Sequence, residues 1–313
     1  MTALALVLGL AAVSAIPSPP RSAVVSRSTS TAAAGTPTAA APRHDPFAGL
    51  GTWVDNYDYQ PVLQPRGRRP RIGPSAVARM ARAGVSTLFI QIVPGDRPEA
   101  GPADPELVGT FLARAHDHGL TAVGWYLPDF GDVAGEARFL EAAGAFRSHG
   151  QAFDGLALDI EVQPAVPSSA ERSRRLIQLS DALRAKVTGR PLGAIVLAPV
   201  LMEAVNPQLW PSFPWRRLTG DFDAWLPMVY WTDRRAASIY RDPARYTDEN
   251  LRRLRADLGA TDARIHAIGG VGDRLTTRQC AAFGATARRG GTIGLSIYDF
   301  VSVRNPACPL ASG

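Results

Sequence analysis

The feature that most constrains the fold of this chain is an alternation that begins near residue 51 and recurs eight times. In each unit a short apolar, β-branched or aromatic run precedes a longer amphipathic stretch, as expected for a strand followed by a helix. Eight strands and about seven helices within roughly 260 residues predict a single-domain α/β fold, the (β/α)8 TIM barrel. The eight runs begin at Gly51, Ser86, Thr121, Asp154, Leu192, Ala224, Arg264 and Thr292.

The boundaries of the amphipathic stretches support this interpretation. One stretch starts at Asp104-Pro105 and stops at Gly119, and another is predicted to start at a Thr247 cap and to stop at Gly259. A doubly wound open sheet is the alternative, but it normally has a glycine-rich phosphate-binding turn after its first strand. The first run here continues as "VDNYDYQ", which has no glycine.

The first 46 residues differ in composition from the rest of the chain. Residues 1–16 contain an apolar run that is short for a bilayer span and ends in the small residues Val13-Ser14-Ala15, as export signals do. Because no basic residue precedes Arg21, an uncleaved anchor is the alternative to a cleaved signal peptide. Residues 17–46, rich in Pro, Ser, Thr and Ala, predict a disordered linker. The barrel domain is therefore expected over residues 47–313, secreted or at the cell surface, with membrane contact only through the N-terminal segment.

Cysteine and charge content restrict the partners and cofactors. The two cysteines, Cys280 and Cys308, favour a disulfide in an oxidising compartment, with two buried thiols as the alternative. The net charge is +6, but the dense basic run at 65–71 lacks interleaved aromatic residues, so we expect a solvated loop and no nucleic-acid partner. No zinc-type spacing occurs, so we expect no metal, and we expect no other cofactor. The absence of a Gly-x-Ser-x-Gly motif argues against a serine hydrolase. We expect the protein to be a monomer.

Two acids interrupt the fourth apolar run, "FDGLALDIE" at residues 153–161. Since strand side chains alternate, Asp159 and Glu161 share one face and the aliphatic residues share the other. The acids should then point into the barrel near the C-terminal end of the strand, where the active sites of this architecture are built. Neighbouring buried carboxylates raise each other's pKa and hold a proton, which predicts Glu161 as a general acid with Asp159 as its partner. A structural pair bound to inward arginines is the alternative.

The same run resembles the fourth-strand signature of family 18 glycoside hydrolases, the chitinase type, Asp-Gly-x-Asp-x-Asp-x-Glu. Asp154, Gly155, Asp159 and Glu161 match it, and Ala157 replaces the middle aspartate. The resemblance implies that the glutamate protonates the glycosidic oxygen. It also implies that the neighbouring aspartate orients the acetamido group of the substrate, whose carbonyl attacks the anomeric carbon.

Two further runs match this family in part. "PMVYW" in the sixth run is similar to its Met-x-Tyr-Asp motif, which implies that Tyr230 hydrogen-bonds the acetamido group, while Trp231 stands where an aspartate is usual. In the eighth run Leu295 stands where the family has a tryptophan, and Tyr298 is the candidate substitute for that aromatic floor.

Other sugar-cleaving barrels differ from the chitinase type because they use a second catalytic carboxylate. Ordinary retaining and inverting mechanisms place one across the substrate from the acid, and the seventh run contains no acid before Asp273. This favours assistance by the substrate, or a second carboxylate from another part of the chain: Asp55, Asp58, Asp233 or Asp299. The chain also resembles the family 25 lysozyme-type muramidases, which carry Asp-x-Glu on strand four and acids near the ends of strands one and six.

The sequence therefore predicts a glycoside hydrolase that acts on polysaccharides of N-acetylamino sugars, either chitin-type or peptidoglycan. The predicted catalytic residues are Glu161, Asp159 and Tyr230. A noncatalytic barrel that binds envelope polysaccharide is the alternative, because Ala157, Trp231 and Leu295 depart from the family pattern. Polar and aromatic residues near the strand ends are predicted to bind substrate; they are Asp55, Tyr57, Gln91, Tyr126, Trp231 and Tyr298, with the four tyrosines including Tyr230 directed inward.

Overall fold

The computed structural model describes residues 44–303, in which eight parallel strands close into a barrel in chain order. Each strand pairs with the next, and β8 pairs with β1. The strands are β1 (Gly49–Val54), β2 (Thr87–Gln91), β3 (Thr121–Tyr126), β4 (Gly155–Ile160), β5 (Leu192–Leu197), β6 (Ala224–Met228), β7 (His266–Val271) and β8 (Gly294–Tyr298). The predicted (β/α)8 barrel is confirmed.

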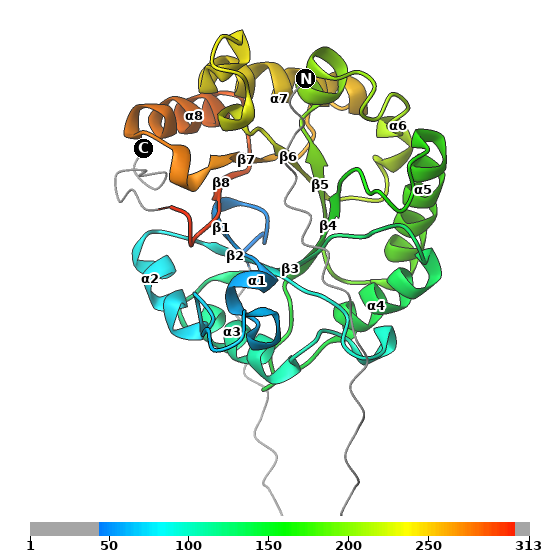
Figure 1. The fold of residues 1–313 in the computed structure, drawn as a ribbon, viewed down its shortest axis with the longest axis vertical. Coiled ribbons are helices and arrows are strands. Elements are labelled where there is room, and N and C mark those ends of the chain that lie inside the picture. The colour runs from blue at the N-terminus through cyan, green and yellow to red at the C-terminus, as the bar shows by residue number, and fades with distance from the viewer. Residues whose placement is uncertain (1–43, 304–313) are drawn as a thin grey trace, which may run out of the picture. The chain divides into compact units, whose positions relative to one another are not determined.

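Helices lie outside the ring of strands (Figure 1). They are α1 (Asn56–Tyr59), α2 (Val77–Arg82), α3 (Pro105–Asp117), α4 (Val133–Ala145), α5 (Ser169–Lys186), α6 (Trp215–Leu218), α7 (Pro243–Leu258) and α8 (Thr277–Arg289). The predicted start of α7 is wrong, because Asp242 caps the helix through the amide of Arg245 and Pro243 is its first residue. Its predicted end is right, since Gly259 adopts the left-handed conformation that glycine tolerates best.

The strands pack apolar side chains on both faces. On β4, Leu156, Leu158 and Ile160 contact the helix-facing core, whereas Ala157 belongs to the cluster that fills the barrel. That inner cluster reaches the N-terminal end of the barrel at Phe47, and a Cβ added at Gly193 would lie 2.7 Å from the Phe47 ring. The floor of the barrel is therefore closed by apolar side chains.

One histidine lies inside the barrel. His266 of β7 is fully buried, with Nδ1 2.9 Å from the carbonyl oxygen of Phe47 and Nε2 3.0 Å from Ser296 Oγ. The indole of Trp53 also donates to Ser296 Oγ, at 2.8 Å. A neutral ring satisfies both contacts, and burial lowers the pKa of His266 to about 4. His266 is therefore a core residue.

This histidine predicts a specific loss of stability in acid. Between its ordinary pKa of 6.5 and the folded value of about 4, the unfolded chain binds a proton that the folded protein does not. Acidification across this range should remove about 3 kcal/mol of the free energy of unfolding. In His266→Gln, which has no ionisable ring, this contribution is absent, so urea unfolding should show a smaller stability difference from wild type at pH 4.5 than at pH 7.5. An unchanged difference would contradict the assignment.

Several predictions concern parts of the chain outside residues 44–303. The export segment 1–16, most of the linker 17–46, and Cys308 lie there, so the disulfide with Cys280 of α8 stays a prediction. The last linker residues are described, and Asp45 forms an ion pair with Arg264. Contacts with the barrel thus begin two residues before the predicted boundary. No helix within 44–303 has the length and apolar character that a membrane span requires.

Candidate active site

The acid pair of β4 lies at the C-terminal end of the barrel. Asp159 pairs in register with Ile195 of β5, a member of the inner cluster, and is 8% exposed. Glu161 follows the last residue of β4 and is partly exposed. The Oδ1 atom of Asp159 accepts no hydrogen bond from the described residues. Asp159 therefore combines burial with an open acceptor, an arrangement that costs free energy unless a ligand satisfies it.

Burial raises the pKa of both carboxyls, and neighbouring charges raise that of Asp159 further. For Asp159 the causes are burial, the charge of Glu161 and the charge of Asp55, in that order; for Glu161 the cause is burial. Within residues 44–303 neither forms an ion pair, which excludes the arginine-bound alternative there. Two neighbouring carboxyls without a cation bind a proton more tightly than an isolated carboxyl does. The pair can thus donate a proton and accept one.

Two tyrosines lie beside this pair. Tyr230 follows β6 and Tyr298 ends β8, with their ring centroids 6.1 Å apart. The pKa of Tyr230 is raised well above its ordinary value, first by burial and then by the charges of Asp159 and Glu161. Its hydroxyl therefore stays protonated and can donate a hydrogen bond to a ligand.

Asp55 extends the site from β4 to β1. It follows the last residue of β1 and accepts the hydroxyl hydrogen bond of Tyr298, with oxygen separations of 2.6 and 2.7 Å. Burial raises the pKa of Asp55 to about 7, with further increases from the charges of Asp299 and Asp58, while the Tyr298 bond lowers it. Asp55 is thus a third carboxyl that can be neutral at physiological pH.

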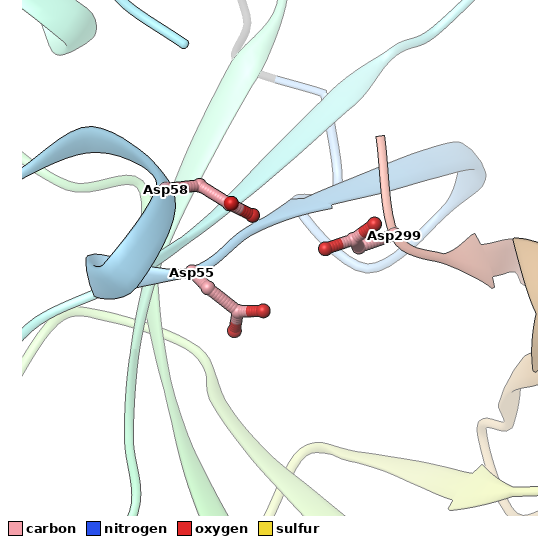
Figure 2. A group of neighbouring side chains, drawn as sticks. All are labelled: Asp55, Asp58 and Asp299. Carbon is pink, nitrogen blue, oxygen red and sulfur yellow. The ribbon is translucent and has the colours of Figure 1, made fainter. Parts of the chain in front are cut away.

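Asp55 is also part of a carboxyl cluster, which it forms with Asp58 and Asp299 (Figure 2). Carboxylate oxygens of the three residues lie within 4.8 Å of one another. Asp58 of α1 accepts a hydrogen bond from Arg71 Nη1 at 2.9 Å, and Asp299 Oδ1 accepts the amide of Ser302 at 2.7 Å. Each of these bonds uses one carboxylate oxygen, and the two bonds fix Asp58 and Asp299 in place.

Three residues predicted to face substrate lie elsewhere. Tyr57 belongs to the short helix α1 and is 60% exposed, so its predicted inward position is wrong. Tyr126 is also not inward, because its ring packs edge-on against Phe139 of α4, at 5.0 Å between centroids. Trp231 is fully buried against Phe283 of α8, at 5.2 Å, and offers no surface to a ligand.

Gln91 has a structural contact. Its Oε1 accepts the amide of Asn56 at 3.1 Å and so holds the turn that follows Asp55. Among the candidates for the second catalytic carboxylate, Asp233 forms an ion pair with Arg274. The inward aromatic residue of β3 is Trp125, which lies 5.9 Å from Trp53 and pairs in register with Ala157. The strict alternation of β3 could have identified Trp125 instead of Tyr126.

Comparisons with known proteins identify the fold. No protein-family model and no curated protein matches the sequence. The glycoside hydrolase domain of PgaB (BpsB) from Bordetella bronchiseptica is similar in structure, with a TM-score of 0.58 at 14% identity, over 84% of this chain and 97% of that one. A GH18 chitinase from Pseudoalteromonas aurantia has a TM-score of 0.58 at 9% identity, over 84% and 98%. The spore cortex-lytic enzyme SleL from Bacillus megaterium has a TM-score of 0.57 at 8% identity, over 84% and 72%. The chain therefore has a TIM-barrel fold similar to that of these glycoside hydrolases.

Proposed function

We propose that this protein is a secreted or cell-surface glycoside hydrolase, acting as a monomer on polysaccharides of N-acetylamino sugars, either chitin-type or peptidoglycan. The observation that carries the proposal is the pair Asp159 and Glu161, which lies at the C-terminal end of the barrel without an ion-pair partner among the described residues. The proposal is also supported by similar solved structures, which include chitinases and a cortex-lytic enzyme.

Glu161 and Asp159 would divide the chemistry between them. Protonated Glu161 gives its proton to the glycosidic oxygen as the bond to the anomeric carbon breaks, and the acetamido carbonyl of the same sugar attacks that carbon. Asp159 Oδ1, which lacks a donor, accepts the acetamido N–H, and the Tyr230 hydroxyl donates to the acetamido group. Ionised Glu161 then takes a proton from water, which adds to the anomeric carbon and regenerates the acid.

Assistance by the substrate is favoured by the composition of β7. The strand reads "HAIGGV" and contributes no acid across the barrel from Glu161. Mechanisms with two enzyme carboxylates need the second at about 5 to 9.5 Å from the first. Without an acid on β7, the acetamido group is the nearest nucleophile that a substrate of this class would bring.

A noncatalytic polysaccharide-binding barrel is the second candidate. Leu295 of β8 packs in the buried cluster that includes Phe283, and Trp231 lies in the same cluster. Neither can form an aromatic floor for a sugar, and Ala157 offers no carboxyl. These departures favour a barrel that has kept its shape and lost the reaction.

The release of reducing ends distinguishes the two candidates. The full chain should release them from N-acetylglucosamine oligomers or from peptidoglycan, and not from chitosan, whose deacetylated sugars lack the assisting group. Binding to these polymers in a pull-down without any release would favour the noncatalytic candidate. Equal cleavage of chitosan would show that an enzyme carboxylate, and not the acetamido group, attacks the anomeric carbon.

A further inference from the structure

Carboxyl side chains gather at the C-terminal end of the barrel. Five carboxyls lie within electrostatic range of one another there: Asp55, Asp58, Asp159, Glu161 and Asp299. The salt bridges within residues 44–303 include one of these carboxyls, in the pair between Asp58 and Arg71. Desolvated like charges at such distances cannot all be ionised. At least one proton must therefore be held within the carboxyl cluster as well as within the β4 pair.

The carboxyl cluster is fixed in place from three directions. Closure of the barrel brings Asp299, just after β8, against Asp55, just after β1. Arg71 holds Asp58, and the amide of Ser302 holds Asp299. Asp58 is 4% exposed and Asp299 is 7% exposed, so water screens neither. Rigid buried carboxyls of this kind control the protonation of a neighbouring carboxyl.

We propose that Asp299 and Asp58 are positioning residues that add to the effect of burial and keep Asp55 as a neutral carboxyl, so that Asp159 carries the single negative charge that the reaction needs. This inference rests on the proposed function. The physical reason lies in Asp159, whose pKa an ionised Asp55 would raise. The proton that the pair holds then moves from Glu161 to Asp159, so Glu161 loses the proton it must donate and Asp159 loses acceptor capacity for the acetamido N–H. Ionisation of Asp55 should therefore inhibit hydrolysis.

The groups that face Asp55 act in opposite directions. Burial raises its pKa most; Asp299 and Asp58 raise it further by their charge, and Asp299 also by a hydrogen bond that requires one shared proton. Tyr298 lowers it by donating to the ionised form. From β4, Asp159 interacts with Asp55 by charge. Since Asp55 has a pKa of about 7, its ionisation should cause a loss of kcat/KM above about pH 7 in the wild type.

The pH dependence of kcat/KM tests this inference through three variants. Asp299→Asn should move the alkaline loss of kcat/KM to lower pH by about one unit, and Tyr298→Phe should move it to higher pH. Asp55→Asn, a permanently neutral mimic, should keep measurable hydrolysis and lack this alkaline transition. Inactivation by Asp55→Asn would identify Asp55 as an ionised base or nucleophile and overturn the proposal, as would identical pH profiles for wild type and Asp299→Asn. Restoration of Asp299→Asn by Ca²⁺, or loss of wild-type activity on chelation, would also overturn it in favour of a cation.

A second readout does not depend on activity. In protein labelled with ¹³C at aspartate carboxyls, the resonance that disappears in Asp55→Asn should titrate near pH 7 in the wild type and at lower pH in Asp299→Asn. The matched control is Asp221→Asn, which removes another buried aspartate of raised pKa, just before β6 at the opposite end of the barrel. It should leave that titration unchanged. If Asp55 titrates near pH 7 but the protein has no hydrolytic activity, the proposed function is refuted and the effect of the cluster stands. If Asp55 instead titrates with the ordinary pKa of an aspartate, the proposed effect of Asp299 and Asp58 is refuted.

Discussion

Replacing Glu161 with glutamine is expected to lower kcat on acetylated sugar polymers by about 10² to 10⁴-fold. Glutamine has nearly the same shape but no proton to give to the glycosidic oxygen. Substrate binding should change little, because Asp159 and Tyr230 remain, so the loss should appear in kcat more than in KM. Initial rates of reducing-end release on N-acetylglucosamine oligomers of defined length measure it.

Stability distinguishes a chemical effect from a structural one in this variant. Burial raises the pKa of Glu161, so its ionised form costs free energy in the folded state. Removing the carboxylate should then leave the melting temperature equal or higher while activity falls. The matched control is Glu171→Gln on α5, where a partly exposed helix glutamate pairs with Arg174. Equal activities of the two variants would remove Glu161 from the reaction.

The fold could be predicted because its signal is repeated. A strand with period two followed by a helix with period 3.6 recurs eight times, and a single misread boundary changes nothing in the count. The late start predicted for α7 at Thr247 illustrates this, since Asp242 begins the helix earlier and the barrel is the same. The inward position of Asp159 follows from the same period, because the aliphatic residues beside it are required to face the helices.

Side chains beyond the strand ends could not be predicted in this way. Tyr57 lies in a helical turn and Trp231 in a 3-10 turn, where alternation no longer sets direction. The error at Tyr126 has a different cause. It is the last residue of β3, and its ring has a partner in Phe139 that only the packing of α4 reveals.

The carboxyl cluster shows a further limit of sequence reasoning. Asp55 and Asp299 lie near the two ends of the domain, and the sequence suggests each as a separate candidate for the second catalytic carboxylate. Their contact exists because β8 pairs with β1, with Gly51 opposite Ser296 and Thr52 opposite Ile297. Alternation predicts which face a residue occupies, but the stagger of the closing strands decides which residues meet across the seam.

The largest loss of stability is expected from Trp53→Ala, at about 3 to 5 kcal/mol. Trp53 is 2% exposed inside the barrel, stacks on Phe89 at 4.2 Å between centroids, and donates from its indole to Ser296. Alanine leaves a cavity next to the catalytic end that the rigid strands cannot close, so the melting temperature should fall by about 10 °C. Trp53→Phe is the matched control: it keeps a stacked ring and loses the indole hydrogen bond, so it should cost less than half as much. Similar losses in the two variants would mean that the hydrogen bond, and not ring packing, stabilises the interior, because only the bond is absent from both.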